Sequence, residues 1–217
     1  CSLQLVYDFF KNNYFIGLLF DYDGYVFDAT KSKNTHSEID LKDLNNIQLV
    51  QYKRSEAENN YTQALLDLGL SKNENNVFEL TQNTTTQDAY TSIQWAIENK
   101  EKLESLGFSL ENLKIDGKKI DSNTVTIAFS NTIQNDWFDI KMTVVCDDFE
   151  FNFSELIPNI KNKNRLFALP NGNYFLIPSE WMTRYSAMSK LAKIKNGNLA
   201  VLKSNFAVFE DIPQLKQ

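Results

Sequence analysis

The chain has 217 residues, of which 42% are hydrophobic and 13% aromatic, and its formal net charge is −6. This composition excludes a disordered chain. With only 7 glycines and 4 prolines, it also argues against a linker-rich or solenoid-like build. A chain of this length is expected to bury roughly 70% of the surface that its unfolded form exposes. It therefore fits one large domain or two small ones, with a core that needs no disulfide or metal.

The two cysteines, Cys1 and Cys146, provide no disulfide framework, and we expect reduced thiols. There is no signal sequence, and no apolar run approaches the ~20 residues of a membrane span. We therefore expect a cytoplasmic protein with no membrane partner. Because the chain does not begin with methionine, we expect a processed protein or a piece of a longer one. A mature lipoprotein can begin with Cys followed by Ser, and this is the less favoured interpretation.

The first fifty residues read mainly as strands and turns. Asp23-Gly24 stands between two apolar runs and predicts a hairpin, because glycine supplies the positive φ of a type I′ turn. The segments before residue 55 are predicted as a helix or strand at Leu3–Phe10, hairpin strands at Tyr14–Phe20 and Tyr25–Ala29, a polar loop around a weak strand at Thr30–Asn46, and a strand at Ile47–Tyr52.

Two helices are predicted in the first half of the chain. Apolar residues at helical spacing indicate a helix over Ser55–Leu70, which opens with a capping box of Ser55 and Glu58. A second, longer helix is predicted over Thr86–Leu106, where a glycine follows at the C-cap position. A short strand, Val77–Leu80, is predicted between them.

From residue 113 the sequence changes to a series of strands with short helices at its end. Residues 139–144 alternate polar and apolar side chains, which is typical of a half-buried strand. The predicted elements are a turn at Asp116-Gly117 within Leu113–Ile120, strands at Thr124–Phe129, Phe138–Val145 and Phe149–Phe153, a helix at Ser154–Ile160 capped by Ser154, a strand pair at Leu166–Leu169 and Tyr174–Ile177, a helix from Ser179 to Asn196-Gly197 that carries Trp181, Tyr185, Met188 and Ala192 on one face, and a last short helix at Lys203–Phe209.

The predicted fold class is α+β. Antiparallel hairpins and a meander carry two longer helices in the N-terminal half and short capped helices at the C-terminal end. We predict a division into an N-terminal α+β subdomain, residues 1–112, and a second α+β subdomain, residues 113–217, with a basic C-terminal block.

The basic block spans residues 161–203 and has a local net charge of +7, so the remainder of the chain carries −13. Such asymmetry can mark a surface that faces a polyanion. The alternatives are an electrostatic match to the acidic remainder and an ordinary solvated helix face. The candidate DNA-contact residues are Lys161, Lys163, Arg165, Arg184, Lys190, Lys193 and Lys195.

Few residues indicate catalysis. His36 is the only histidine, which excludes a multi-histidine metal site, and its polar setting predicts a solvated loop residue. The sequence contains neither a P-loop nor a dinucleotide-binding glycine motif. We expect no catalytic residue, no metal site and no cofactor in this segment.

One short motif stands out as an exception. Leu18–Gly24 resembles the first motif of haloacid-dehalogenase-type phosphatases, in which Asp21 would be the nucleophile and Asp23 the acid, with Asp147–Asp148 as a late Mg²⁺-binding pair. A plain Asp-Gly hairpin is favoured instead, because the sequence after Gly24 continues as a strand and the alternating β/α pattern of that fold is missing.

Three motifs occur in order in the second half: Asn135–Ile140, Phe167–Gly172 and Leu176–Trp181, the last followed by a helix with Arg184 and Tyr185. In this order the C-terminal part resembles the helicase-associated region that precedes the motor in bacterial Swi/Snf-type DNA translocases. The resemblance covers about residues 135–195 and fits residues 14–134 loosely.

The resemblance implies a non-catalytic accessory module of a longer ATP-dependent DNA helicase, whose downstream motor would bind the ATP and Mg²⁺. The implied partners are that motor, in the same chain, and duplex DNA. Lysine and arginine would contact the DNA without reading its sequence, by neutralising phosphates. Two alternatives stay open: the Mg²⁺-dependent phosphatase, and a pure protein-interaction module, which an exposed apolar patch would favour.

Overall fold

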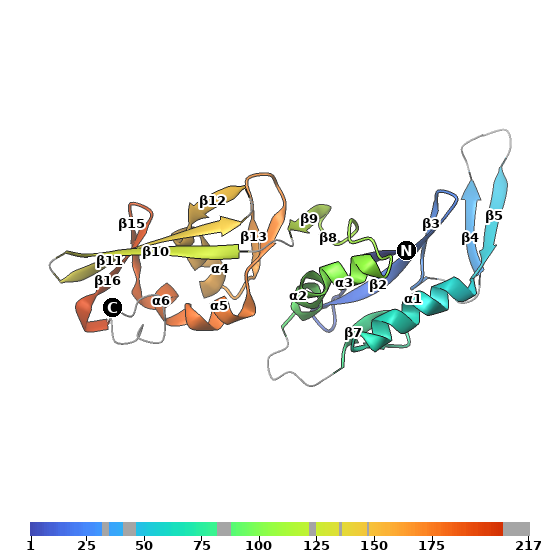
Figure 1. The fold of residues 1–217 in the computed structure, drawn as a ribbon, viewed down its shortest axis with the longest axis horizontal. Coiled ribbons are helices and arrows are strands. Elements are labelled where there is room, and N and C mark those ends of the chain that lie inside the picture. The colour runs from blue at the N-terminus through green and yellow to red at the C-terminus, as the bar shows by residue number, and fades with distance from the viewer. Residues whose placement is uncertain are drawn as a thin grey trace. The chain divides into compact units, whose positions relative to one another are not determined.

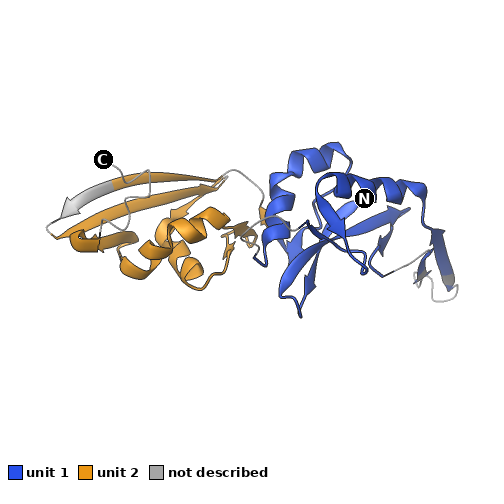
Figure 2. Ribbon diagram, turned by 90° about the horizontal axis from the view of Figure 1, so that it is seen from below, with its two compact units in different colours: residues 1–119 blue, residues 120–217 orange. Residues whose placement is uncertain are grey.

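The structure, a computed structural model, describes residues 1–31, 35–40, 47–81, 88–121, 125–134, 136–146 and 148–205. It divides into two compact units, unit 1 (Cys1–Lys119) and unit 2 (Ile120–Gln217), which Figure 2 colours separately. The division follows residue 119, against 112 in the sequence-based prediction. Strands pair mostly antiparallel and helices are present in both units, so the predicted α+β class is confirmed.

Unit 1 is built on a five-stranded sheet in which β2 is central (Figure 1). One edge of β2 pairs with β1, and the other pairs with β3 and β7. The predicted Asp-Gly hairpin is confirmed, because Asp23 and Gly24 have φ values of 53° and 88° between β2 and β3. The strands of this sheet are β1 (Ser2–Asp8), β2 (Asn13–Tyr22), β3 (Tyr25–Asp28), β6 (Leu70–Lys72) and β7 (Phe78–Leu80).

Three helices belong to unit 1: α1 (Glu56–Asp67), α2 (Thr91–Glu98) and α3 (Lys100–Ser105). The helix predicted over 86–106 is two helices in the structure. They separate at Asn99, whose side-chain amide donates to the carbonyl of Trp95 at 2.9 Å and competes with the helical backbone. Residues 86 and 87 lie outside the described residues. The helices and the sheet share one apolar core that includes Leu3, Ile16, Leu18, Leu65, Trp95 and Leu103.

A separate two-stranded sheet completes the N-terminal part of unit 1. It pairs β4 (Thr35–Asp40) with β5 (Gln48–Lys53) in antiparallel register. Strand β4 lies where a weak strand was predicted within the polar loop over Thr30–Asn46. Near the end of unit 1, β8 (Lys114–Ile115) and β9 (Lys118–Asp121) meet at the predicted Asp-Gly turn.

Unit 2 contains a sheet in the order β10-β11-β16-β15, with β12 also paired to β11. A hairpin of β13 and β14 follows the predicted strand pair, and β14 pairs in parallel with residues 120 and 121 of β9. The strands are β10 (Val125–Gln134), β11 (Trp137–Cys146), β12 (Phe149–Asn152), β13 (Leu166–Ala168), β14 (Tyr174–Leu176), β15 (Lys193–Lys195) and β16 (Asn198–Leu202).

The helices of unit 2 are shorter than predicted. The one expected to run to Asn196-Gly197 is α5 (Ser179–Arg184) followed by α6 (Ser186–Leu191). Asn196 and Gly197, with φ values of 51° and 78°, form the turn of the β15–β16 hairpin. The predicted capping role of Ser179 is wrong, since no side chain caps α5. Most of the short helix predicted over 203–209 lies outside the described residues.

The remaining helical segment of unit 2 is η1 (Phe153–Leu156) running into α4 (Ile157–Lys161). Its cap is Asn152 with Glu155, which form a capping box, rather than Ser154 as predicted. Ser154 is buried and donates its hydroxyl to the carbonyl of Gly197 at 2.7 Å. The helices and the sheet enclose one core that includes Ile140, Met142, Phe153, Trp181, Tyr185 and Met188. Both cysteines are free, as predicted.

Candidate functional site

A buried polar cluster joins β2, β4 and the start of α1 in unit 1. We call it the Glu58 cluster; its members are Tyr22, His36, Arg54 and Glu58. His36 and Glu58 are 1% and 3% exposed. His36 Nε2 lies 3.0 Å from Glu58 Oε1, and Arg54 Nε donates to Oε2 at 2.5 Å. The hydroxyl of Tyr22 also donates to Oε1, so the carboxylate accepts from three side chains.

Aromatic rings enclose the imidazole of His36. The ring of Phe27 stacks on it with centroids 4.7 Å apart, and Phe20 and Tyr22 lie within 6.3 and 5.8 Å. The prediction of a solvated loop histidine is therefore wrong. The alternation of β4 turns this side chain toward apolar rings and a carboxylate that come from elsewhere in the chain.

The predicted capping box at the start of α1 is also wrong. Ser55 occupies the N-cap position but makes no side-chain capping hydrogen bond. The side chain of Glu58 turns into the Glu58 cluster instead, where charged and buried donors are available. Arg54, four residues earlier, reaches the same carboxylate as an i,i+4 ion pair.

The protonation states follow from these contacts. Burial acts to raise the pKa of Glu58, but hydrogen bonds from Tyr22, Arg54 and His36 and the charge of Arg54 outweigh it, so its pKa lies below the ordinary value. Burial, with a smaller contribution from the hydrogen bond to Glu58, raises the pKa of Tyr22. At neutral pH Glu58 is therefore a carboxylate and Tyr22 a neutral phenol.

This arrangement suits anchoring better than catalysis. A general base needs a free lone pair and a pKa near the working pH. Both oxygens of Glu58 already accept hydrogen bonds, and its pKa is lowered. Within the described residues, no group of three or more His, Cys, Asp or Glu side chains is placed to hold a metal ion.

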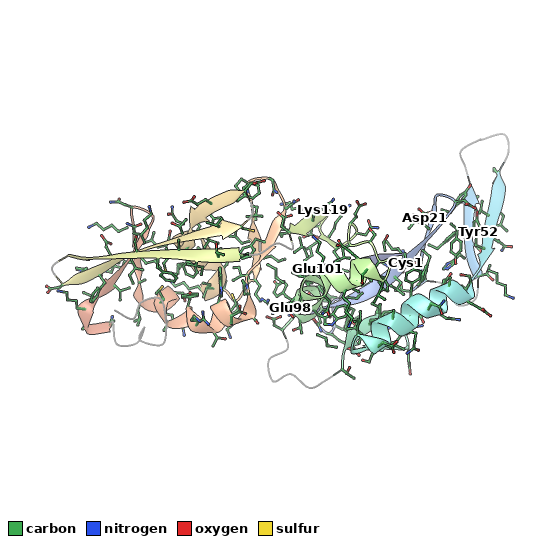
Figure 3. All side chains as sticks on the ribbon, in the orientation of Figure 1. Cys1, Asp21, Tyr52, Glu98, Glu101 and Lys119 are labelled. Carbon is green, nitrogen blue, oxygen red and sulfur yellow. The ribbon has the colours of Figure 1, made fainter. Side chains whose placement is uncertain are left out.

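The two aspartates of the phosphatase motif lie at the β2–β3 hairpin. Asp21 Oδ1 accepts the backbone N–H of Gly24 at 2.8 Å, and Asp23 Oδ2 accepts from the hydroxyl of Tyr52 at 3.3 Å. Figure 3 labels Asp21 on β2 and Tyr52 on β5. Asp147 lies outside the described residues. Asp21 thus bonds to the turn and Asp23 to a side chain of β5, and this hairpin setting argues against the phosphatase alternative.

The β4–β5 hairpin carries large aliphatic side chains on the face opposite His36. Ile39 and Leu49 are direct cross-strand partners, and they are 59% and 63% exposed. Ile47, just before β5, is 66% exposed. We call these three residues the hairpin apolar face. The Glu58 cluster thus holds one face of the hairpin, and the other presents aliphatic surface to solvent.

The basic residues of unit 2 do not all reach the surface. Arg165 is 2% exposed, and its Nε donates to the carbonyl of Ile177 at 2.8 Å. The prediction that Arg165 contacts DNA is therefore wrong, because a core guanidinium does not meet a phosphate. The other six candidates are exposed: Lys161, Lys163, Arg184, Lys190, Lys193 and Lys195.

These six exposed cations belong to two faces of unit 2. On strands β15, β16 and β11, Lys193, Ala200 and Asp139 lie side by side in register. The next residues along β16 and β11, Leu199 and Ile140, point into the core. Side chains alternate along a strand, so Lys193 and Lys195 lie on the sheet face away from the helices. The Lys193 ammonium lies 5.3 Å from the ring of Trp137 on the same face. The other four cations belong to the helical layer.

The acidic and basic residues divide unequally between the units. Residues 1–119 hold 18 acidic and 12 basic side chains, whereas residues 120–217 hold 10 of each. The basic block is therefore balanced by acidic residues of its own unit, and the net negative charge of the chain resides in unit 1.

The fold and the sites together define a two-unit α+β protein with a buried ionic anchor and an exposed aliphatic hairpin. Comparisons with protein-family models, with curated proteins and with solved structures find no match. The resemblance to the Swi/Snf helicase-associated region therefore stays a prediction. Among the described residues, no helix combines the length and the apolar character needed to cross a membrane.

Proposed function

We propose that this chain is a non-catalytic interaction module that binds a protein partner through the hairpin apolar face. The observation that carries the proposal is the pairing of Ile39 with Leu49 at 59% and 63% exposure, on a hairpin whose other face is held by the Glu58 cluster. Exposed apolar patches of this kind mark interaction surfaces.

Two physical arguments support a protein as the partner. A two-stranded hairpin is marginally stable alone, so a partner that covers its aliphatic face also stabilises it. Unit 1 has 18 acidic and 12 basic side chains. Charge complementarity therefore favours a basic partner and speeds its encounter with the hairpin.

Photo-crosslinking tests this proposal. A photoreactive amino acid at position 49 should capture one protein in cells, and the same group at Leu106, which is 44% exposed in the same unit, should not. The captured protein is then purified and titrated against the chain by calorimetry. We expect Leu49→Ser to weaken binding at least about tenfold, which corresponds to roughly 1.4 kcal/mol. Leu106→Ser should leave binding unchanged. Equal affinity for both variants would show that the hairpin is not the contact.

A second candidate function is the accessory role in a Swi/Snf-type ATP-dependent helicase, with non-specific duplex DNA contact. It is favoured by the four exposed cations of the helical layer of unit 2: Lys161, Lys163, Arg184 and Lys190. In this role the segment has no cofactor of its own, and ATP and Mg²⁺ belong to the motor domain. The balanced charge of unit 2 implies weak binding.

Fluorescence anisotropy with a labelled DNA duplex, at several salt concentrations, tests this second candidate. Removal of one cation that neutralises a phosphate should reduce the slope of log affinity against log salt by about 0.9. We expect Lys161→Ala combined with Lys190→Ala to lower the slope. Lys102→Ala, an exposed substitution in unit 1, should leave it unchanged. An absence of binding at low salt, or a slope that the double variant does not alter, would reject DNA contact by the helical layer.

A further inference from the structure

The tip of the β1–β2 hairpin in unit 1 presents two phenylalanines to solvent. Phe9 is 81% exposed and Phe10 is 98% exposed, the highest values among the large hydrophobic side chains of the described residues. Their rings meet edge to face, with centroids 6.3 Å apart and planes at 81°. The pair therefore forms a convex, apolar projection.

Hydrogen bonds within the loop fix this projection. Asp8 Oδ1 accepts the backbone N–H groups of Phe10 and Lys11 at 2.9 and 3.1 Å. The hydroxyl of Tyr7 donates to Asn12 Oδ1 at 2.6 Å, and Asn12 has a φ of 49°. Because the loop is already ordered, binding through the tip loses little further conformational entropy.

A row of tyrosines lies directly behind the tip. Tyr7 and Tyr14 are cross-strand partners whose ring centroids are 4.9 Å apart, and Tyr14 stacks on Tyr90 at 6.0 Å. Tyrosine rings with an apolar body and a polar hydroxyl favour the boundary between membrane and water. Phenylalanine rings lie at the tip and tyrosine rings lie behind them. An inserted tip would therefore place the phenylalanines toward the bilayer interior and the tyrosines at the headgroups.

The area of the tip argues against a protein as its occupant. Two aromatic side chains together bury about 300–500 Å², whereas each partner of a standard protein interface buries about 800 Å². The hairpin apolar face cannot supply the missing contact area, because it lies at the other end of strand β2. Strand β2 (Asn13–Tyr22) separates the tip from the β2–β3 turn, where Tyr52 contacts Asp23. Ten strand residues span about 33 Å.

We propose that the Phe9–Phe10 tip is an interfacial anchor that inserts into the headgroup and acyl boundary of a zwitterionic lipid bilayer. The acidic excess of unit 1, 18 against 12 side chains, disfavours an anionic surface. The proposal departs from the sequence-based expectation of no membrane partner, which was based on the lack of a spanning segment, because a shallow anchor needs no such segment. This inference is independent of the hairpin apolar face and of DNA contact.

Co-sedimentation of the full chain with phosphatidylcholine vesicles tests the anchor. In the double variant Phe9→Ser, Phe10→Ser the membrane partition coefficient should fall at least about a hundredfold, because each ring removed from the bilayer lowers it about tenfold or more. Leu106→Ser is the control and should not change it. Circular dichroism verifies that the variants fold, which their exposure predicts. Adding anionic lipid should weaken binding.

A second measurement reads insertion directly. In the variant Phe10→Trp, fluorescence should be quenched by lipids brominated on the acyl chain, relative to the unmodified chain in the same vesicles. Three outcomes overturn the proposal: no sedimentation of the unmodified chain with phosphatidylcholine, equal sedimentation of the Phe9→Ser, Phe10→Ser variant, or binding that increases with anionic lipid. A dimer in solution that dissociates in the double variant would also overturn it, because the occupant would then be a second copy.

Discussion

Replacing Glu58 with glutamine keeps the size of the side chain but removes its charge. The carboxylate accepts from Tyr22, His36 and Arg54. Glutamine offers one carbonyl oxygen and places an NH₂ group where the second acceptor was, so at least one donor of the Glu58 cluster loses its acceptor. Losing a hydrogen bond to a charged group costs about 1.5–3 kcal/mol, and an unsatisfied buried group adds about 1–3 kcal/mol. We expect the free energy of unfolding of unit 1 to fall by about 3 kcal/mol at pH 7.

The matched control is Glu56→Gln. Glu56 is exposed and shares the first turn of α1 with Glu58. Both substitutions remove a negative charge near the helix N-terminus, so their effect on the helix dipole, about 0.3–1 kcal/mol, cancels in the comparison. Urea unfolding followed by circular dichroism gives the free energies. Hydrogen exchange measured by mass spectrometry on strands β4 and β5, residues 35–40 and 48–53, localises the loss, and we expect faster exchange there in Glu58→Gln only.

The pH dependence provides an independent check. The pKa of Glu58 is lower in the folded state than the ordinary value, so the folded state binds this proton more weakly than the unfolded state. Its contribution to stability is present above the unfolded pKa, about 4.3, and is lost as the pH falls through the folded pKa. The difference between the unmodified chain and Glu58→Gln should therefore shrink below about pH 4. A difference that matches Glu56→Gln at pH 7, or that stays constant down to pH 3, would refute the role of Glu58 as an ionised anchor.

Three further changes test the packing of unit 2 by thermal unfolding. Gly197→Ala places a Cβ 3.1 Å from Asn152 Nδ2 at a position where φ is 78°. It should therefore destabilise the protein more than Gly172→Ala, where φ is 88° and no atom lies within 4 Å of the added Cβ. Equal losses of stability in the two variants would contradict this. Tyr185→Phe removes a buried hydroxyl that makes no hydrogen bond of normal geometry within the described residues, although the Arg184 side chain acts on it. Stability should therefore stay equal or rise by about 1 kcal/mol, and a clear loss would show that Arg184 donates to this hydroxyl. Ser154→Ala removes the 2.7 Å bond to the Gly197 carbonyl and should cost about 1–3 kcal/mol; a loss below about 0.5 kcal/mol, as at an ordinary surface site, would show that this bond contributes little.

Secondary-structure elements that are determined by residues close together in the sequence could be predicted. The β2–β3 hairpin follows from Asp23-Gly24, where two adjacent residues supply the positive φ values. Helix α1 follows from apolar residues at helical spacing, and the strand pairing of β13 with β14 follows from the turn between them. In each case residues within one or two turns of each other determine the geometry.

Elements that depend on distant residues were missed. His36 is buried because Phe27 and Glu58, which belong to other elements of unit 1, meet it in space. Arg165 is buried because the Ile177 carbonyl accepts its guanidinium. Asn196-Gly197 is compatible with either a helix end or a hairpin turn, and the pairing of β15 and β16 onto β11 decides between them. The spacing of four between Arg54 and Glu58 was the available signal for the Glu58 cluster, but a capping box uses the same glutamate.

The burial of His36 has a practical consequence for anyone who handles this protein. It is the only imidazole in the chain and is 1% exposed, so a reagent that acylates imidazoles has no target until the hairpin detaches. The rate of that modification then equals the population of the detached state multiplied by the intrinsic reactivity. A single chemical-labelling experiment thus measures the fraction of molecules in which β4 is detached from the rest of unit 1, without a probe being introduced.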